Sequence, residues 1–457
     1  MMKRFISLAI ALIILALPFC SFISCDTALG GDVKTLYIYN WGEYISDGSE
    51  GCLDSNRAFE LWYEYKYGEK VNVVYSTYSS NEDMYAKLSG GAVNYDIIVP
   101  SDYMIERLIN SEDGKSLLHP LNKENIPHAS NLSSDFYGKD AKYDYYDEGS
   151  VYSIPYFYGM IGIIYNPQVL GSEIKDEDKS WKLMWNKDHN GNLLDFNGNI
   201  LQFNNSRDAF GTAQYMLGID VNTDSEEEWR AALDALKEQK KFVQGYVMDE
   251  IFNKMEGGSA GIAAYYAGDY LTMYENSSTD EKPSDLKFFY PKEGTNLYVD
   301  AMCIPATSQN KELAEAYIDF MLMVDEDFEN EAPDFYDYFS ERTGGEEFYS
   351  AAVANAEYTY YASPNQKVVD DESYRESMDS IREGAFDLMY DQDALATATY
   401  YKNLTPEKLA LINTLWEELK SDIDVSPVII IICVAIIGSL AAGGLFFGLR
   451  KRYRNNY

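Results

Sequence analysis

The chain has 457 residues, which is enough for two or three domains. It carries 74 acidic and 37 basic residues, and a formal charge of −37 repels nucleic-acid phosphates and anionic lipid head groups while it tolerates cations. We therefore expect no nucleic-acid partner. Aromatic residues make up 15% of the chain, so the composition is that of a protein with a sizeable core and not of a disordered acidic polymer.

The N-terminal region has the pattern of a secretory signal. Residues 1–4 include Lys3 and Arg4, and residues 5–24 form an apolar run that ends in small residues. The stretch FISC, residues 22–25, resembles a bacterial lipoprotein box, although Phe22 is unusual there. We expect residues 1–25 to be a signal segment. Three alternatives stay open at its end: a lipid on Cys25, ordinary cleavage at or near Ser24, or an uncleaved anchor.

Strand-like and helix-like segments alternate at the start of the body. Residues 35–41 are typical of a strand, residues 52–68 of a helix that ends at Gly68, residues 70–79 of a second strand, residues 81–91 of a helix, and residues 95–103 of a third strand. This order predicts an α/β parallel sheet.

Polar and aromatic residues lie at the ends of two of these predicted strands. The end of the first strand carries Trp41 and Tyr44, and the end of the third carries Ser101 and Tyr103. Ligands of open α/β sheets bind beyond the carboxyl ends of the strands, so we expect these four side chains to face one crevice.

A second α/β segment is predicted to follow residues 152–166. Residues 188–201 contain two Asn-Gly pairs and predict a hairpin, with a calcium loop as an alternative that the glycine spacing does not favour. Residues 261–270, 286–294 and 297–305 have strand-like runs. Residues 310–323 and 405–420 are typical of helices, and the charged residues 325–335 of an exposed loop.

The cysteines and histidines offer no cofactor motif. Cys52 and Cys303 are the only cysteines of the body, and a disulfide between them is an option that one pair supports weakly. No CxxC spacing occurs, and the three histidines are scattered. We expect no metal, no cofactor and no histidine-based catalytic group.

The C-terminal region predicts a membrane anchor. Residues 428–449 contain no charged side chain and are long enough to cross a bilayer as a helix. Four basic residues follow within residues 450–457, and basic residues stay on the cytoplasmic side. We expect a transmembrane helix over residues 428–449, a short cytoplasmic tail over residues 450–457, and a body held outside the cytoplasm at the cell membrane.

The body, roughly residues 33–420, resembles the spermidine/putrescine periplasmic-binding family of bacterial ABC importers. The resemblance rests on motifs that occur in family order, namely YNWGEYI, VVYSTYSSNEDMYAKL, YDIIVPSDYMIERL, YSIPYFYGMIGIIYN, FYPKEGTNLYVDAMCIPATSQNKELAEAYIDFML and YASPN. It implies an α/β, two-lobed periplasmic-binding-protein fold of type II with a hinged cleft between the lobes. It assigns residues 33–155 and 297–365 to lobe 1, and residues 156–296 and 366–425 to lobe 2.

The same resemblance implies the ligand-binding residues. NWxEY gives an aromatic pair, VPS a hydroxyl wall, YAGD and LYVDAMCIP two acidic residues with aromatic neighbours, and NNSRDAF a third acid beside Asn205. The ten implied residues are Trp41, Tyr44, Ser101, Tyr103, Asp208, Tyr266, Asp269, Tyr298, Asp300 and Tyr361.

These residue types suit a flexible alkyl chain with ammonium ends. Carboxylates offset the lost hydration of each ammonium with charge-assisted hydrogen bonds, and aromatic faces attract the cations and pack the methylenes. Two positions depart from the family pattern: Gly42 replaces a small hydroxyl residue, and Asn205 replaces an aspartate that is typical of spermidine binders. Together with Asp269 they favour putrescine over spermidine.

The expected function is therefore a receptor that captures a polyamine and delivers it to an ABC permease and, through it, to the ATPase subunits. The first alternative is a membrane-tethered receptor for another small ligand, such as a sugar. A glycosidase would need a pair of carboxylates in acid and base roles, and no such pair stands apart from the ligand carboxylates, so we expect no enzyme. A signalling receptor would need a partner, because the tail is short.

Overall fold

The computed structural model describes residues 33–421, apart from residues 92, 112–113 and 280. The strands of this part form a single mixed sheet with the order β2-β1-β3-β9-β4-β7-β5-β6, while β10 pairs with β9 and β8 pairs with β4. The strands are β1 (Lys34–Trp41), β2 (Val71–Tyr78), β3 (Ile97–Ile98), β4 (Ser153–Tyr165), β5 (Ile200–Phe203), β6 (Val243–Val247), β7 (Ile262–Tyr266), β8 (Lys287–Phe289), β9 (Asn296–Cys303) and β10 (Thr399–Tyr400).

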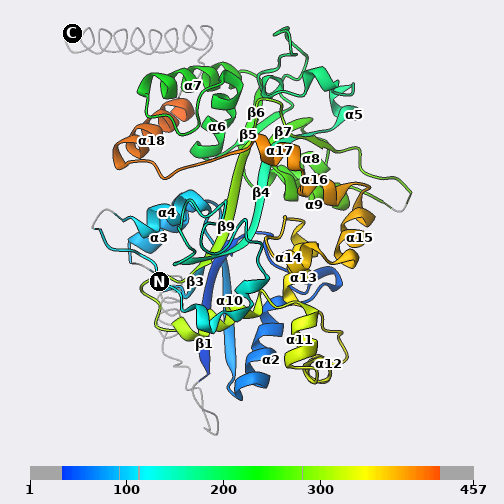
Figure 1. Cartoon of the computed structure of the whole chain (residues 1–457). Helices are drawn as coiled ribbons and strands as arrows, with labels where there is room; N and C mark the ends of the chain where they lie inside the picture. Colours follow the sequence, from blue (N-terminus) through cyan, green and yellow to red (C-terminus); the bar gives the residue numbers. More distant parts are fainter. Residues whose placement is uncertain (1–32, 92, 112–113, 280, 422–457) are drawn as a thin grey trace, which may run out of the picture.

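Two lobes share this sheet, and we name them by their strands. The first lobe contains β1, β2 and β3, and the second contains β5, β6 and β7, while β4 and β9 run from one to the other (Figure 1). All 13 residues of β4 are buried, because its first part pairs with β9 and its last part with β7 and β8. The long apolar run of β4 is thus explained by its position at the centre of the sheet.

The first lobe has the parallel core that the sequence predicts. β1 lies parallel to β2 over its whole length and parallel to β3 through two residue pairs. β9 is antiparallel to both β3 and β4, so the complete sheet is mixed and not parallel. Because β1, β2 and β3 are parallel, their carboxyl ends lie at the same edge of the lobe, as the prediction for Trp41 and Ser101 requires.

Helices cover both lobes. In the described residues they are α2 (Ser55–Tyr67), α3 (Asn81–Ser89), α4 (Asp102–Ile109), α5 (Pro167–Leu170), α6 (Ser206–Leu217), α7 (Glu226–Gln239), α8 (Glu250–Glu256), α9 (Ala267–Asn276), α10 (Lys311–Phe320), α11 (Asp325–Glu331), α12 (Phe335–Thr343), α13 (Ala351–Thr359), α14 (Gln366–Val369), α15 (Glu372–Ile381), α16 (Ala385–Met389), α17 (Gln392–Thr397) and α18 (Pro406–Ser421). α2 and α3 pack on β2 of the first lobe, and α18 packs on α7 and α6 of the second (Figure 1).

Local signals set the ends of several of these helices. Asp54 accepts a hydrogen bond from the amide of Arg57 at the start of α2, and Gly68 ends the helix in the left-handed conformation with φ 71°. Asn205 caps α6 in the same way, through the amide of Asp208. Thr405 and Pro406 begin α18, as the sequence predicts.

Two sequence predictions of local structure are wrong. Residues 188–201 do not form a hairpin: Lys187 and Leu193 make one isolated antiparallel bridge, and β5 then pairs in parallel with β6 and β7. Residues 325–335 are not an exposed loop, because α11 fills most of this stretch and Phe328 is fully buried. Asp327 explains the helix start, since its carboxylate accepts a 3.0 Å hydrogen bond from the amide of Val324.

The structure also bears on the cysteines and the chain ends. Cys52 and Cys303 are both free thiols, so the optional disulfide does not form. In the part of the chain that the structure describes, no helix has the length and apolar character of a membrane span. The predicted signal (residues 1–25), transmembrane helix (residues 428–449) and tail (residues 450–457) lie outside the described residues.

Candidate functional site

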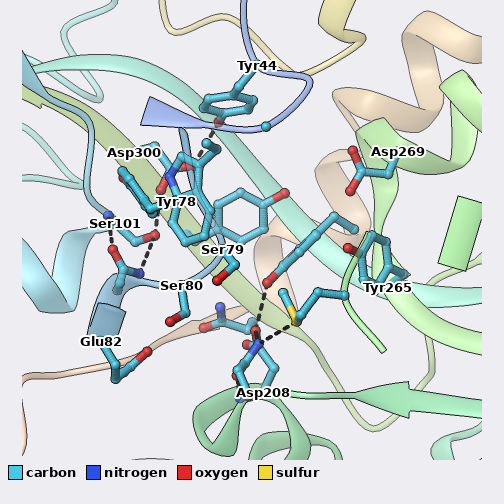
Figure 2. Close-up of a pocket in the computed structure, with 18 of the residues that line it drawn as sticks. Tyr44, Tyr78, Ser79, Ser80, Glu82, Ser101, Asp208, Tyr265, Asp269 and Asp300 are labelled. Atoms are coloured by element: carbon cyan, nitrogen blue, oxygen red, sulfur yellow. Dashed lines mark hydrogen bonds between the residues drawn. The ribbon is translucent and has the colours of Figure 1, made fainter. Parts of the chain in front are cut away.

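A cavity of about 830 Å³, its open mouth included, lies between the two lobes. All ten side chains that the sequence selects line it: Trp41, Tyr44, Ser101, Tyr103, Asp208, Tyr266, Asp269, Tyr298, Asp300 and Tyr361. In Figure 2, Tyr44 lies toward the top of the view, Asp300 and Ser101 at the upper left, Asp208 at the bottom and Asp269 at the right. The structure therefore brings the whole predicted set together, and ligand binding by it stays a prediction.

Asp300 on β9 accepts hydrogen bonds from two hydroxyl groups of the first lobe. The hydroxyl of Tyr44 donates a 2.7 Å hydrogen bond to Oδ2, and the hydroxyl of Ser101 donates a 2.6 Å bond to Oδ1. The side chain is only 4% exposed. Burial raises the pKa of Asp300 to about 6, although the bonds from Ser101 and Tyr44 pull in the opposite direction.

Ser101 and Tyr103 are held in place by Asn81 at the start of α3. The Asn81 amide nitrogen donates to the Ser101 hydroxyl over 3.0 Å and to the Tyr103 hydroxyl over 3.2 Å, while its oxygen accepts from the Ser101 backbone amide. Ser101 precedes the first turn of α4. This network fixes the direction from which Ser101 reaches Asp300.

Asp208 lies on the wall that the second lobe contributes. It sits in the first turn of α6, where Oδ2 accepts hydrogen bonds of 2.8 Å from both Tyr266 and Asn205. Burial raises the pKa of Asp208, and these two bonds partly offset the increase. The neutral Asn205 therefore orients Asp208 as well as capping the helix.

Asp269 occupies a third position in the cavity, in the first turn of α9. Burial raises its pKa to about 7; the Tyr361 hydroxyl opposes this increase, and the charges of Asp249 and Glu43 add to it. A group with this pKa is half ionised near neutral pH, so a nearby ammonium would shift it fully to the carboxylate form.

Aromatic rings cover the wall between these carboxyl groups. The indole nitrogen of Trp41 donates a 2.9 Å hydrogen bond to the carbonyl of Val99, and its ring packs against Tyr78 with centroids 4.6 Å apart. The rings of Tyr44 and Tyr361 meet edge to face at 4.8 Å. Aromatic faces next to buried carboxylates suit an organic cation with an apolar body.

Glycines make room for three tyrosines of the wall. A Cβ on Gly159 would lie 2.4 Å from the Tyr298 hydroxyl, and one on Gly268 would lie 2.7 Å from the Tyr361 ring. A Cβ on Gly211 would overlap the hydroxyl of Tyr401 in the same way, at 2.1 Å. Each of these tyrosine side chains thus packs directly against the backbone of a glycine.

Several residues that sequence reasoning did not select also line the cavity. They include Tyr78, Asn81, Glu82, Asp102, Met248, Asp249, Tyr265 and Tyr401. Glu82 reads in the sequence as an ordinary acid of a helix first turn, and no pattern shows that this turn faces the cavity. Asp102 is 1% exposed, its pKa rises to about 7 through burial, and the hydroxyl of Tyr145 donates to it.

Tyr401 belongs to a segment, residues 399–403, that lies between the lobes. Asn222 of the second lobe binds this segment through a 2.7 Å bond to the Tyr400 carbonyl and a 2.8 Å bond from the Lys402 amide. On the first-lobe side, the ring of Tyr400 stacks on Tyr145 with centroids 3.5 Å apart. Only the folded chain shows that this late segment reaches the cavity.

The charge of the cavity wall is strongly one-sided. Six carboxyl side chains line it, and no lysine, arginine or histidine is among its described lining residues. The six are Glu82, Asp102, Asp208, Asp249, Asp269 and Asp300. Buried carboxylates without basic partners are costly, so this wall favours a cationic ligand over a neutral or anionic one.

One further group of metal-binding side chain types occurs among the described residues. Oxygen and nitrogen atoms of Glu177, Asp178 and His189 lie within 4.8 Å of one another, away from the cavity. Nδ1 of His189 donates a 2.7 Å hydrogen bond to the carboxylate of Asp178, which accounts for the closeness of this pair. The group adds no residue to the candidate site.

The fold and the cavity between its lobes define a solute-binding protein, and sequence comparison agrees. Residues 62–329, more than half of the chain, match the family described as bacterial extracellular solute-binding protein. The chain therefore belongs to the bacterial extracellular solute-binding protein family. Members of this family are binding receptors, which agrees with the expectation that the chain is not an enzyme.

Two curated relatives and one solved structure are similar to most of this chain. The chain is 29% identical over 303 residues to the spermidine/putrescine-binding periplasmic protein of Escherichia coli K12, covering 66% of this chain and 76% of that one. It is 26% identical to the putrescine-binding periplasmic protein SpuD of Pseudomonas aeruginosa, covering 70% and 81%. A structure described as a putative spermidine/putrescine ABC transporter from Listeria monocytogenes superposes with a TM-score of 0.63 at 29% identity, covering 85% and 99%. The α/β periplasmic-binding-protein fold predicted from the sequence is thereby confirmed.

Proposed function

We propose that this protein captures a polyamine outside the cytoplasm and delivers it to an ABC importer. One observation carries the proposal: six carboxyl groups and an aromatic wall enclose a cavity whose described lining has no basic side chain. The relatives that bind spermidine or putrescine support the same ligand class.

The residues of the cavity suit the binding of an alkyl chain with ammonium ends. An ammonium that leaves water loses several kcal/mol of hydration, and Asp300 or Asp208 offsets this loss with a charge-assisted hydrogen bond. Rings such as Trp41 and Tyr44 each contribute roughly 0.5–2 kcal/mol through cation–π attraction and also pack the methylenes. Hinge motion about β4 and β9, the strands common to both lobes, would close the cavity on the ligand.

Within the polyamines we infer a preference for putrescine over spermidine. Asn205 is neutral, and its side chain is engaged by the backbone amide and the carboxylate of Asp208. Gly42 brings no hydroxyl to the wall; a Cβ there would lie 3.8 Å from Asp249 of the second lobe. Both features reduce the number of groups that could bind a third amine.

Calorimetric titration of the full-length chain with putrescine, cadaverine, spermidine and spermine tests the proposal. We expect binding of at least one of these amines, tightest for putrescine, and a loss of at least tenfold in Asp300→Asn. Tighter binding of spermidine would reverse the preference. Binding of a maltose-type sugar, with no binding heat from any amine, would show that the ligand is a neutral solute and not a polyamine.

We also propose that the chain works at the cell membrane with its body outside and its tail inside. The support is sequence alone: the uncharged residues 428–449 and the basic residues 450–457 after them. A tether raises the effective concentration of the receptor at its permease. Deletion of the residues after 425 should leave amine binding intact and reduce uptake by cells; unchanged uptake by a released protein would refute the tether.

A further inference from the structure

Glu82 and Asp208 reach the same part of the cavity from opposite lobes. Glu82 lies in the first turn of α3, which packs on β2 of the first lobe, and Asp208 lies in the first turn of α6, which packs on β5 and α7 of the second. Both line the cavity, and they lie close enough for the charge of Asp208 to contribute to the raised pKa of Glu82. Figure 2 shows both toward the lower part of the view, away from Asp300 and Tyr44.

Among the described residues, no lysine or arginine forms an ion pair with Glu82 or Asp208. Two arginines lie nearby, and their charges partly oppose the rise in the pKa values of these two carboxyl groups. Arg107 stacks on Tyr85 at 3.8 Å, and Arg207 stacks on Tyr401 at 4.5 Å. The Arg207 guanidinium is held in that place by the carbonyls of Val221 and Lys402. Both guanidinium groups thus stack on tyrosine rings and form no ion pair with the two carboxyl groups.

Tyrosine hydroxyls donate hydrogen bonds to both carboxyl groups. Tyr103 donates a 3.0 Å hydrogen bond to Oε1 of Glu82, and Tyr266 donates a 2.8 Å bond to Oδ2 of Asp208. Tyr401 also lines the cavity, is 2% exposed, and lies close enough to Asp208 for its hydroxyl to oppose the rise in the pKa of that carboxyl. The hydroxyl oxygen can also accept a hydrogen bond from a polar group of a ligand.

We propose that Glu82 and Asp208 form a two-lobed subsite for one ammonium group of the ligand, with the Tyr401 hydroxyl as its third polar group. The proposal rests on the proposed function and names Glu82 as a specificity-determining residue. An ammonium has three N–H donors, which matches two carboxylates and one hydroxyl oxygen. Because the carboxylates belong to different lobes, this subsite supplies its attraction only when the lobes come together around a cation.

Glu82 compensates for the neutral Asn205. With asparagine at position 205, the second lobe has one carboxyl group fewer at this end of the cavity than the family pattern has, and Glu82 of the first lobe supplies another. The end of the cavity opposite Asp300 therefore carries two carboxyl groups, Glu82 and Asp208, which together can bind one ammonium group. A ligand with an ammonium at each end can then occupy the Asp300 pocket and the Glu82–Asp208 subsite together.

Calorimetry of Glu82→Gln, with Asp83→Asn as a matched control, tests the subsite. Asp83 is the next residue of the same helix turn, is exposed and does not line the cavity, so both variants remove one negative charge from the same place in the fold. We expect Glu82→Gln to weaken binding of the preferred amine at least tenfold and Asp83→Asn less than twofold. Glutamine retains an oxygen that accepts the Tyr103 bond, so this loss reports the charge and not the position of Tyr103.

A double-mutant cycle with Asp208→Asn tests whether the two carboxylates share one ammonium. If the two carboxylates share one ammonium, the fold-loss in amine affinity of the double variant is clearly smaller than the product of the two single-variant fold-losses. Losses that multiply, or a Glu82→Gln variant that binds like the wild type, would overturn the subsite while leaving polyamine binding by the wild type in place. A wild-type chain that binds no amine would overturn the proposed function and this subsite with it.

Discussion

The hydroxyl of Tyr44 donates a 2.7 Å hydrogen bond to the carboxylate of Asp300, although 256 positions separate the two residues. Tyr44 follows the first strand of the body, and Asp300 lies on the strand that returns from the second lobe. This bond helps to keep a buried carboxylate partly ionised in a cavity without basic side chains, and it is the first contact to test.

Tyr44→Phe should weaken amine binding. The change removes a hydrogen bond to a charged acceptor, worth about 1.5–3 kcal/mol, and lets the pKa of Asp300 rise above its present value of about 6. We expect a loss of roughly tenfold or more in calorimetric affinity at pH 7. Tyr37→Phe is the control, because Tyr37 is an exposed tyrosine of the same strand region and lies outside the cavity. Equal affinities for both variants would contradict this role for Tyr44.

Amine affinity should rise with pH. Burial raises the pKa of Asp300 to about 6 and the pKa of Asp269 to about 7, so each carboxyl is partly protonated below neutral pH. An ammonium binds the ionised forms and displaces these protons. We expect affinity to increase between pH 5 and pH 8, and the binding enthalpy at pH 6.5 to differ between phosphate and Tris buffers. An enthalpy that is the same in both buffers would show that no proton is released.

The same pKa values predict how the ligand-free fold responds to pH. A carboxyl whose pKa is raised in the folded state binds more protons there than in the unfolded chain, so its stabilising contribution is complete below about pH 4 and is lost as the pH rises through about 7. Urea unfolding at pH 4.5 and 7.5 measures this loss. The Asp269→Asn variant has no titratable group at position 269. Its urea unfolding midpoint should therefore fall less between pH 4.5 and pH 7.5 than the wild-type midpoint does.

Gly159→Ala should disturb the cavity wall. The added methyl would lie 2.4 Å from the Tyr298 hydroxyl, so the ring has to move, at a cost of about 1–3 kcal/mol of stability. We expect a lower melting temperature and at least tenfold weaker amine binding. Gly245→Ala is the matched control, because it also lies in a strand and its nearest neighbour would be 4.0 Å away. Similar melting temperatures for the two variants would argue against a tight fit at Gly159.

The two cysteines of the body should react differently with a thiol reagent. Cys303 is buried on β9, and Cys52 is partly exposed; both are free. We expect iodoacetamide to label Cys52 in the native protein and Cys303 only after unfolding, as read by peptide mass spectrometry. A peptide pair joined by a disulfide between these two cysteines would contradict the structure.

The sequence was sufficient for much of the site because the relevant residues follow recognisable strands. Trp41 ends β1, Tyr44 and Ser101 follow β1 and β3, and Asp300 lies within the apolar run of β9, so strand patterns and motif order predicted that these residues lie near one another. The fold of the first lobe followed from the same patterns. What these residues bind depends on chemistry that the amine titrations must measure.

Other parts could not be predicted, for identifiable reasons. Glu82 looks like any acid in a helix first turn, and only tertiary packing shows which side of that turn faces the cavity. The acidic residues 325–335 suggested a loop, yet burial of Phe328 and the cap from Asp327 stabilise α11. The Asn-Gly pairs of residues 188–201 indicated turns correctly, but turns do not specify whether the next strand pairs locally or, as for β5, with distant parallel partners.

Tyr401 makes the completion of the cavity depend on almost the whole described chain. Tyr44, Asp300 and Tyr401 line the same cavity, although Tyr44 lies near the start of the described residues and Tyr401 near their end. Contacts across such separations form slowly, because long stretches of chain must be closed before they are made. The cavity wall is therefore among the last parts of the fold to be completed.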